Sequence, residues 1–365
     1  MNAKRPIMIM AGGTGGHIFP ALAVASVLRH RGEDLVWLGT RRGLEAKLVP
    51  AEGIKMEWIE IVGLRGKGWR DRLFAPFRLG LALLQSLRIL RLTRPKVVLG
   101  FGGYVSGPCG LMAAVTRIPL VLHEQNAVPG LTNRLLARFA SRVFTGFPVA
   151  LPGSDANREF SGNPIRPEIA SLPEPSVRMK ERQGPLRVLV LGGSQGAMSL
   201  NRIVPAALAR LPAALRPEVW HQAGERHMVA AESAYEKAEV AARVVPFVSD
   251  MAKAYGWADL VICRSGALTV AELAAAGVAS LLVPFPHAVD DHQYFNGNYL
   301  VTAGAARMLL ESELTDVLLA RELTDLLDRP RLMAMAVKAR NLAHLDAAER
   351  IAMACMQLGN DGRVA

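Results

Sequence analysis

The sequence predicts an α/β protein that consists of two similar domains in tandem. A pattern occurs twice, at residues 7–28 (IMIMAGGTGGHIFPALAVASVL) and at residues 187–208 (RVLVLGGSQGAMSLNRIVPAAL). In each copy a short apolar run is followed by a glycine-rich turn and an Ala/Leu/Val-rich helical stretch, as at the opening of a β–loop–α unit. Strand-like and helical runs then alternate along the chain, which favours parallel sheets covered by helices on both faces. The length of 365 residues also suits two domains.

Further strand-like runs follow each opening. In the first half they lie at 35–38, 97–99, 120–123 and 143–145. In the second half they lie at 219–222, 244–247, 260–263 and 280–283. Ligands of such sheets bind beyond the carboxyl ends of the strands, so we expect the site where the strands end.

The boundary between the domains is predicted in residues 162–185, GNPIRPEIASLPEPSVRMKERQGP. This stretch is rich in proline and charge and has little apolar periodicity, which is typical of a linker. We therefore expect an N-terminal domain at 1–162 and a C-terminal domain at 163–344. The last stretch, 331–358, is predicted to be helical.

The composition limits the class of protein. Three cysteines, Cys109, Cys263 and Cys355, have neither metal-ligand nor redox-motif spacing, so a zinc site or disulfide framework is not expected. The apolar run after Lys4 and Arg5 is too short for a signal peptide. Residues 97–116 carry five glycines and a proline and are predicted to be strand and loop. The net charge of +11 indicates an anionic partner: nucleic acid, a phosphorylated substrate or an acidic lipid surface.

Three glycine-rich loops are candidate anion sites. They are GGTGGH at 12–17, GFGGYVSGP at 100–108 and GGSQGA at 192–197. Glycine lets the backbone approach a ligand closely, and the N-terminus of a following helix attracts phosphate. The alternative for each loop is that glycine only allows a helix to pack closely on a strand.

The first loop does not match the common nucleotide motifs. A dinucleotide fingerprint that starts at Gly13 would need a third glycine where Ile18 stands, and an acid where Gly39, Thr40 and Arg41 follow the second strand. The sequence contains no G-x-x-x-x-G-K-[ST] either, so an NAD enzyme and an ordinary P-loop enzyme are both disfavoured.

His17 stands where the first loop meets its helix. A histidine at that place could act as a general base near neutral pH, or it could hydrogen-bond a bound phosphate. The residue types alone leave both roles open.

Several longer segments carry a specific resemblance. They are, in order, GGTGGHIFPALAVA, GFGGYVSGP, HEQNAVPGLTNRLLA, GNPIR, LGGSQGA, CRSGALTVAELAAAG and PFPHAVDDHQYFNG. With these segments the chain resembles the peptidoglycan N-acetylglucosaminyltransferases, the family that converts lipid I into lipid II, from about residue 7 to about residue 345. The residues just before Gln293, HAVDDH, lie in a segment that varies within the family.

The resemblance implies a fold and an activity. The fold is of the GT-B type, two Rossmann-like domains whose parallel sheets face each other across a cleft, with a final helix at about 345–360 that returns to the N-terminal domain. The activity is an inverting transfer of N-acetylglucosamine from UDP-N-acetylglucosamine to the C4 hydroxyl of the N-acetylmuramyl unit of lipid I, with UDP released. This enzyme serves cell-wall synthesis, and hence cell shape and division. No cofactor or metal is expected, since no D-x-D motif occurs.

The resemblance also implies that the C-terminal domain binds the donor. Ser194 would hydrogen-bond the pyrophosphate, and Glu272 would accept hydrogen bonds from the ribose. Without the resemblance, Glu272 would be an exposed helical glutamate. The helix opening that faces the diphosphate and sugar comprises Ala267, Leu268, Thr269, Val270, Ala271 and Glu272.

Other donor contacts come from separate segments. The resemblance places Val248 against the uracil, and it lets Gln293, with Asn296 nearby, bind hydroxyls of the sugar. Arg166 and Asn126 also match donor-binding positions of the family.

The acceptor, undecaprenyl-pyrophosphoryl-N-acetylmuramyl-pentapeptide, is expected at the N-terminal domain. Its pyrophosphate would lie against the first two glycine loops, with Thr14, Gly15 and Gly16 as contacts there or at the edge of the donor. The resemblance favours His17 as the base, with Glu124 as a second candidate or as the partner of His17.

A stretch of basic and aromatic residues at 65–78 suits an anionic membrane surface. The residues expected to contact it are Lys67, Trp69, Arg70, Arg72, Phe74 and Phe77. We therefore expect a peripheral protein at the cytoplasmic face of the inner membrane. A helix packed on the sheet with a solvated basic end is the alternative. Nucleic acid is not expected, because no recognition motif for it occurs.

Three other functions stay open at this point. A UDP-N-acetylglucosamine 2-epimerase would use the same fold without a lipid acceptor. A glycolipid synthase would share the basic and aromatic stretch but differ in HEQN and GGTGGH. A non-catalytic scaffold would bind the UDP-sugar without turnover.

Overall fold

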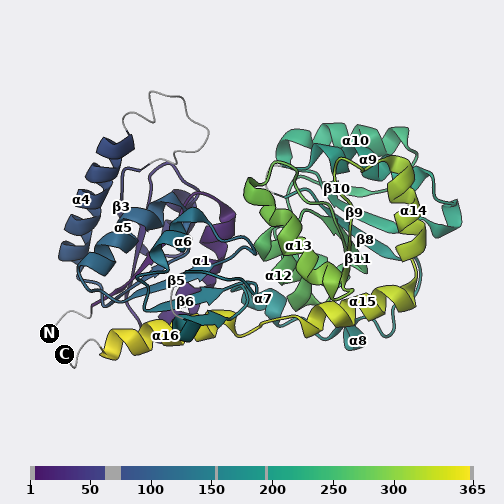
Figure 1. The fold of residues 1–365 in the computed structure, drawn as a ribbon. Coiled ribbons are helices and arrows are strands. Elements are labelled where there is room, and N and C mark those ends of the chain that lie inside the picture. Colours follow the sequence, from purple (N-terminus) through teal and green to yellow (C-terminus); the bar gives the residue numbers. More distant parts are fainter. Residues whose placement is uncertain (1–4, 62–74, 153–154, 194–195, 362–365) are drawn as a thin grey trace. The chain divides into compact units, whose positions relative to one another are not determined.

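The computed structural model describes residues 5–61, 75–152, 155–193 and 196–361. The chain divides into two compact units (Figure 1). Unit 1 runs to Arg166 and takes up the chain again from His344, and unit 2 runs from Pro167 to Ala343. Each unit has one parallel sheet covered by helices, so the predicted α/β class is confirmed.

Unit 1 is built on seven strands in the order β3-β2-β1-β4-β5-β6-β7. Its elements are β1 (Ile7–Met10), α1 (Gly15–His30), β2 (Leu35–Gly39), α2 (Glu45–Ala51), β3 (Lys55–Trp58), α4 (Ala75–Thr93), β4 (Val97–Gly100), α5 (Gly103–Val115), β5 (Leu120–Glu124), α6 (Leu131–Leu136), β6 (Arg142–Thr145), η1 (Asp155–Asn157), β7 (Arg158–Phe160) and α16 (Ala347–Asp361).

Side chains of β1 alternate between two apolar layers, because successive residues of a strand face opposite sides of the sheet. Ile7 and Ile9 pack in one layer with residues of α1 and α16, and Met8 and Met10 pack in the other with residues of α4 and α5. Both faces of the sheet are therefore buried, which is typical of parallel sheets.

Helix α16 belongs to unit 1 although it ends the chain. Ile351, Ala352 and Cys355 are fully buried in the layer that holds Ile7 and Ile9. Arg350 also forms an ion pair with Glu159. The helical stretch predicted at 331–358 is thus two helices, α15 of unit 2 and α16 of unit 1.

Unit 2 is built on six strands in the order β10-β9-β8-β11-β12-β13. Its elements are α7 (Pro167–Ala170), α8 (Pro175–Arg178), β8 (Arg187–Leu191), α9 (Met198–Ala209), η2 (Ala213–Leu215), β9 (Glu218–Gln222), η3 (Glu225–His227), α10 (Met228–Lys237), β10 (Arg243–Val245), α11 (Met251–Trp257), β11 (Leu260–Cys263), α12 (Ala267–Ala276), β12 (Ala279–Leu282), η4 (Val289–Asp291), α13 (His292–Thr302), β13 (Ala306–Met308), α14 (Asp316–Leu326) and α15 (Arg329–Asn341).

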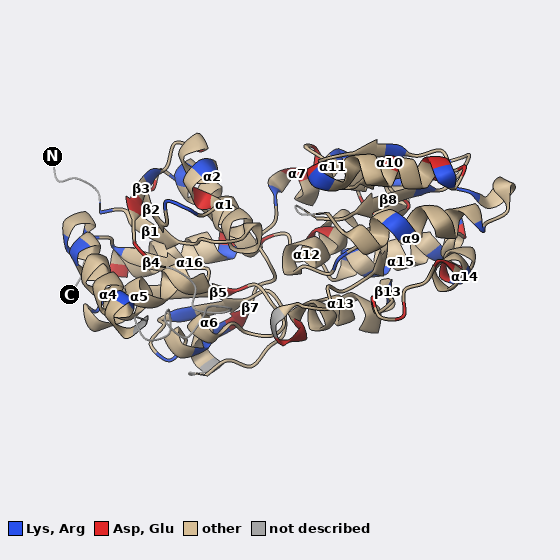
Figure 2. Ribbon diagram, turned by 90° about the horizontal axis from the view of Figure 1, so that it is seen from above, with Lys and Arg blue, Asp and Glu red and all other residues tan. Residues whose placement is uncertain are grey.

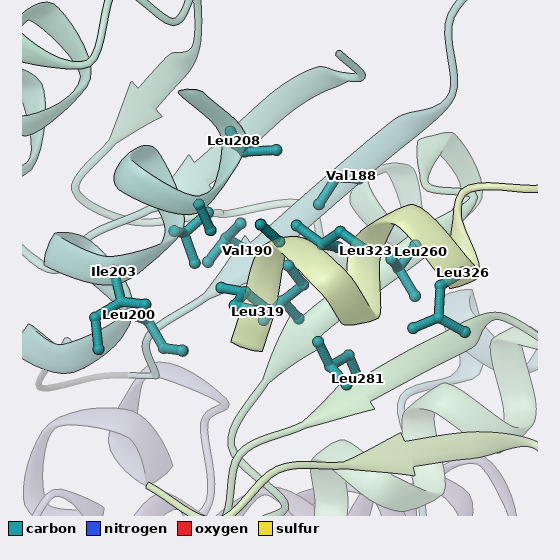
Figure 3. Close-up of a cluster of buried hydrophobic side chains, with 14 of the residues drawn as sticks. Val188, Val190, Leu200, Ile203, Leu208, Leu260, Leu281, Leu319, Leu323 and Leu326 are labelled. Atoms are coloured by element: carbon teal, nitrogen blue, oxygen red, sulfur yellow. The ribbon is translucent and has the colours of Figure 1, made fainter. Parts of the chain in front are cut away.

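One apolar layer of unit 2 lies between the sheet and the helices α9 and α14 (Figure 3). Val188 and Val190 of β8 meet Leu200 of α9 and Leu323 of α14, and all four side chains are fully buried. Removing such a residue from a tight core costs about 2–5 kcal/mol of folding free energy.

The predicted linker was wrong for most of its length. Ile169 and Met179 are buried, and Arg178 donates to the carbonyl oxygens of Ala276 and Gly277 at 2.6 and 2.7 Å, at the C-terminus of α12. The segment therefore packs on unit 2, with a few isolated apolar side chains and arginine–carbonyl bonds in place of a regular apolar period.

Three edge strands escaped prediction, β3, β7 and β13, because charged residues interrupt the apolar run in each: KMEW, REF and ARM. The run predicted as strand and loop at 97–116 contains α5, which tolerates Pro108 inside it. The three cysteines are buried and unpaired. Among the helices of the described ranges, none is both long and apolar enough to cross a bilayer. Within the same ranges, no three His, Cys, Asp or Glu side chains gather as a metal would require.

Candidate active site

The strand order of each sheet reverses at one place, and the glycine loops lie there. In unit 1 the order turns between β1 and β4, and in unit 2 it turns between β8 and β11. Connections on the two sides of such a point diverge and leave a crevice beyond the carboxyl ends of the strands. The first two glycine loops follow β1 and β4, the third follows β8, and the N-terminus of α12 follows β11.

The loop after β1 is held from behind by a buried carboxylate. Glu45, at the start of α2, is fully buried, and its Oε2 accepts a hydrogen bond from the N–H of Gly13 at 3.0 Å. Its Oε1 accepts from the N–H and the hydroxyl of Thr40 at 2.9 and 2.8 Å. Gly13 has a φ of +91°, which side chains rarely adopt. Glu45 therefore fixes the glycine turn.

The residues expected to contact the acceptor lie where this loop becomes a helix. Thr14 is the N-cap of α1, and Gly15 and Gly16 begin its first turn. The N–H of His17 already donates to the carbonyl of Thr14 at 3.1 Å. The N–H groups of Gly15 and Gly16 precede it at the positive end of the helix.

The imidazole of His17 contacts the amide of Gln125. The two atoms are Nδ1 of His17 and Oε1 of Gln125, 3.0 Å apart. The backbone of Gly103, with a φ of +75°, lies beside the ring, so that a Cβ at Gly103 would stand 3.7 Å from Nε2 of His17. Because residue 103 is a glycine, no side chain at this position covers the Nε2 edge of the imidazole.

The carboxylate of Glu124 accepts hydrogen bonds from the residues that follow it in the chain. Its Oε1 accepts from the N–H of Asn126 at 3.0 Å, and its Oε2 accepts from the N–H of Gly130 at 3.0 Å and from Nδ2 of Asn133 at 2.9 Å. Glu124 is 2% exposed. In the structure Gln125, not Glu124, is therefore the partner of His17, because every hydrogen bond of that carboxylate fastens the turn after β5.

Arg166 is half-buried and is the last residue of unit 1 before Pro167. Asn126, beside Glu124, is also half-buried and its Nδ2 lies 3.4 Å from that carboxylate. These two expected donor contacts belong to unit 1, whereas the other expected donor contacts belong to unit 2.

The glycine loop of unit 2 is held by an amide. Oε1 of Gln222 accepts from the N–H of Gly193 at 3.1 Å, and its Nε2 donates to the carbonyl of Gly193 at 3.0 Å. The same Nε2 lies 3.2 Å from the carbonyl of Pro246, two residues before Val248. Gln222 thus joins the predicted phosphate loop to the predicted uracil segment. Ser194 lies outside the described residues.

The N-terminus of α12 presents backbone donors. The N–H of Val270 makes the first intrahelical bond, to the carbonyl of Gly266 at 2.9 Å. The N–H groups of Ala267, Leu268 and Thr269 stand ahead of it, where a helix attracts an anion. Ala271 follows in the second turn and is half-buried.

Glu272 is not an exposed helical glutamate. Only 8% of it is exposed, and its Oε2 accepts a hydrogen bond from the hydroxyl of Tyr255 at 3.1 Å. Tyr255 of α11 is itself 1% exposed. A buried, oriented carboxylate one turn into α12 is suited to hydroxyl groups of a ligand that lies at the helix N-terminus.

The remaining expected donor contacts are placed as follows. Val248 is buried, with 4% of the residue exposed. Oε1 of Gln293 accepts from the N–H of Phe285 at 3.0 Å, which leaves its amide nitrogen to donate to a ligand. Asn296 is fully buried, and its Nδ2 is 3.4 Å from the carbonyl of Ser265.

Five residues of this site were not singled out from the sequence: Glu45, Gln125, Gln222, Tyr255 and His123, whose Nδ1 lies 3.1 Å from Nε2 of Gln125. His123 and Gln125 belong to the segment HEQN, in which only Glu124 and Asn126 were predicted to be site residues. Glu45, Gln222 and Tyr255 had no local signal, because the sheet register or the helix packing brings them to the site.

Two family models match the chain. The model of the glycosyltransferase family 28 N-terminal domain matches residues 7–145, and that of the glycosyltransferase family 28 C-terminal domain matches residues 187–351. Together they span most of both units.

Curated relatives extend the similarity over nearly the full chain. A protein of Nitrosococcus oceani, named UDP-N-acetylglucosamine–N-acetylmuramyl-(pentapeptide) pyrophosphoryl-undecaprenol N-acetylglucosamine transferase, is 56% identical over 355 residues, 97% of this chain and 99% of the relative. A protein of the same name from Alkalilimnicola ehrlichii is 56% identical over 96% of this chain and 98% of its own. The crystal structure of MurG from Acinetobacter baumannii superposes with a TM-score of 0.85 at 40% identity, over 97% of this chain and 99% of that one.

Proposed function

The chain belongs to glycosyltransferase family 28, and from that premise we propose that it is the N-acetylglucosaminyltransferase that converts lipid I into lipid II. The oxygen of the C4 hydroxyl of N-acetylmuramic acid attacks C1 of N-acetylglucosamine. The bond between C1 and the UDP oxygen breaks, UDP leaves, and a β-1,4 link forms with inversion at C1. One observation carries this proposal: the two units offer different chemical groups. Unit 2 has the N–H groups at the start of α12 and the buried carboxylate of Glu272, and unit 1 has the imidazole of His17 at a glycine loop.

Unit 2 holds the donor in this proposal. The diphosphate lies against the N–H groups of Ala267, Leu268 and Thr269 and against the loop at 192–197, to which Ser194 belongs. Glu272 accepts hydrogen bonds from the ribose hydroxyls, and the backbone at Val248 binds the uracil. Gln293 donates from its amide nitrogen to a sugar hydroxyl. The supports are the helix geometry, the burial of Glu272 and the orientation of Gln293.

Unit 1 holds the acceptor and supplies the base. His17 removes the proton of the C4 hydroxyl as the new bond forms, which increases the rate by about 10²–10⁴-fold in positioned systems. Glu124 has a positioning role: its carboxylate accepts hydrogen bonds from Asn126, Gly130 and Asn133 and so holds the turn after β5. Thr14, Gly15 and Gly16 contact the phosphate-bearing acceptor at the start of α1.

Charge builds up on the departing UDP, and backbone dipoles stabilise it. Donors already aimed at a developing charge need no rearrangement during the reaction, so they lower the barrier. The N-terminus of α12 serves this purpose, and in this scheme no metal takes part in the step.

The acceptor carries an undecaprenyl chain, so we also propose that unit 1 binds the membrane surface. Exposed apolar side chains gather on α4 and around α6: Phe77 (75% exposed), Leu84 (67%), Leu131 (59%), Leu135 (54%) and Phe139 (56%). Basic residues interrupt them, as the blue segments of α4 in Figure 2 show. Apolar and basic side chains on one helix suit an anionic bilayer. Of the residues expected from the sequence, Phe77 is described, whereas Lys67, Trp69, Arg70, Arg72 and Phe74 lie outside the described residues. The donor is a cytosolic nucleotide sugar, which favours the cytoplasmic face.

The transfer is tested by UDP release from UDP-N-acetylglucosamine with and without a soluble lipid I analogue. We expect release that depends on the analogue, together with a β-1,4-linked disaccharide. Conversion of the sugar to its manno epimer without acceptor would show an epimerase instead. Binding of the donor without turnover would show a scaffold.

The membrane surface is tested by sedimentation with vesicles that contain phosphatidylglycerol. Leu84→Asp should lower the bound fraction severalfold and leave turnover of the soluble analogue intact. Leu215→Asp is the matched control, because Leu215 is 54% exposed in unit 2. Equal loss of binding in both variants would contradict the assignment.

A further inference from the structure

A line of hydrogen bonds leads away from the imidazole of His17 and has no part in the proposed reaction. His17 meets Gln125, Gln125 meets His123, and His123 meets the carbonyl of Gly162. His123 and Gln125 are 0% and 1% exposed. Neither side chain can reach a substrate directly, so any effect they have on the reaction passes through His17.

The amide of Gln125 can have only one orientation in this line. Its Nε2 lies 3.1 Å from the backbone carbonyl of His123 and 3.1 Å from Nδ1 of the same residue. A carbonyl oxygen can only accept a hydrogen bond, so the atom facing it must be the amide nitrogen. The amide oxygen is therefore the atom that faces His17, and it can only accept.

The protonation of His123 follows from a second carbonyl. Its Nε2 lies 3.1 Å from the carbonyl of Gly162, so Nε2 carries the hydrogen, while Nδ1 accepts from Gln125. Burial lowers the pKa of His123 to about 4, with a smaller contribution from the nearby His17, so this imidazole is neutral near neutral pH and has a single N–H. The two carbonyls at fixed positions thus determine every donor and acceptor in the line.

We infer that Gln125 and His123 are positioning residues that hold His17 in the tautomer whose hydrogen is on Nδ1 and whose lone pair is on Nε2. Oε1 of Gln125 accepts from Nδ1 of His17 at 3.0 Å. Nε2 is then the only basic nitrogen of the neutral ring, and it is the one beside Gly103. An imidazole free in water prefers the opposite tautomer, with the hydrogen on Nε2, so the line reverses an intrinsic preference.

The catalytic meaning of this inference rests on the proposed base role of His17, but the tautomer does not. A base that carries its hydrogen on the wrong nitrogen cannot accept a proton from the hydroxyl, and in a serine protease an error of this kind lowers kcat by about 10⁴-fold. Loss of one neutral hydrogen bond here leaves both tautomers accessible, so we expect a decrease of kcat of about tenfold.

The tautomer is measured by ¹⁵N NMR of the full chain with labelled histidine, at about pH 9, above the pKa of an ordinary imidazole. Protonated and unprotonated ring nitrogens have well-separated shifts, and the spectrum of His17→Gln assigns the resonances of His17. The wild type should show the hydrogen on Nδ1, and Gln125→Met should move it mainly to Nε2. Gln125→Glu, which keeps an acceptor oxygen, should retain it on Nδ1. His30 is the internal control, because its Nδ1 faces the carbonyl of Ser26 at 2.8 Å and does not depend on residue 125.

Two results would overturn the inference: a wild-type His17 with its hydrogen on Nε2, or a Gln125→Met spectrum unchanged from the wild type. The wild-type spectrum decides even where a variant fails to fold. Activity gives a separate result, since Gln125→Met should lower kcat about tenfold with the donor KM unchanged. If His17→Ala keeps its turnover while the spectra are as expected, the base role fails and the tautomer assignment stands.

Discussion

The glycine loops of the two units share a sequence pattern but are held by different chemistry. In unit 1 the N–H of Gly13 donates to the buried carboxylate of Glu45, whereas in unit 2 both backbone polar groups of Gly193 pair with the uncharged amide of Gln222. A carboxylate offsets the positive field of the loop, and an amide does not. In the proposed scheme the loop of unit 2 takes the diphosphate of the donor, and the loop of unit 1 presents His17 to the hydroxyl of the acceptor.

The largest effect should come from the base. Because the proposed base belongs to unit 1, His17→Ala should lower kcat by about 10²–10⁴-fold in the assay with the soluble acceptor. His30→Ala is the matched control, since His30 is exposed on the same helix. A decrease of only a few-fold would reduce His17 to a binding residue and remove the base from the loop of unit 1.

Glu45→Ala should lower the free energy of unfolding by about 2–4 kcal/mol, because it leaves the N–H of Gly13 and the buried N–H and hydroxyl of Thr40 without their acceptor. Glu45→Gln, which keeps the shape and one oxygen, should cost about half as much. Urea unfolding followed by circular dichroism measures both. If Glu45→Gln is as stable as the wild type, the charge is not what holds the loop.

Gln222→Glu would give unit 2 the chemistry of unit 1. A negative charge behind Gly193 should raise the dissociation constant of UDP-N-acetylglucosamine about tenfold, since it repels the diphosphate. Gln222→Leu removes the same hydrogen bonds without adding a charge and should raise the constant less. Equal constants for both variants in calorimetry would show that geometry, not charge, matters at this loop.

Each unit also buries one neutral histidine, and this similarity predicts the response to acid. Burial lowers the pKa of His123 and of His221 to about 4, whereas an unfolded histidine titrates near about 6.5. Between these values the unfolded state binds more protons, so stability falls as the pH falls from about 6.5 to about 4. The slope is about 1.4 kcal/mol per pH unit for each histidine.

Urea unfolding at several pH values measures this slope. His221→Gln should lower the stability at neutral pH, because it removes the bonds of His221 to Tyr235 and Asn201. The same variant should reduce the slope of stability against pH between about pH 4 and 6.5 by the contribution of one histidine, about 1.4 kcal/mol per pH unit. An unchanged slope would mean that His221 does not stay neutral in the folded protein.

The smallest effect should come from Tyr255→Phe. Loss of its hydrogen bond leaves Glu272 less well oriented, which should raise the donor KM about three- to fivefold with kcat nearly unchanged. Tyr294→Phe, at a residue that is 42% exposed, serves as control. If kcat instead decreases by the same factor, Glu272 stabilises the transition state and not only the bound donor.

Local patterns predicted the parts of the molecule that are local. The glycine loops, most strands and the helices that open after the first and third loops follow from β-prone runs and glycine placement, and they lie where the sequence puts them. The helix α5, which begins inside the second loop, was missed. The linker prediction was wrong because proline and charge also occur in segments that pack through isolated side chains, as Ile169 and Arg178 do.

The residues that hold the site could not be predicted in the same way. Gln222 reaches Gly193 because the register of β8 and β9 sets Leu191 opposite Gln222, 31 residues further along the chain. Glu45 reaches Gly13 because β2 pairs with β1 and ends just before α2 begins. Such contacts depend on strand register over long separations, which a single sequence does not reveal.

Equilibrium binding of UDP-N-acetylglucosamine to the His17→Ala protein tests the division between the two loops most directly. Calorimetry gives the dissociation constant, and the soluble-acceptor assay gives turnover on the same preparation. We expect a dissociation constant within about twofold of the wild type, while turnover falls by about 10²-fold or more. A dissociation constant raised tenfold or more, in step with the loss of turnover, would show that His17 binds the donor and would contradict the assignment of the base to unit 1.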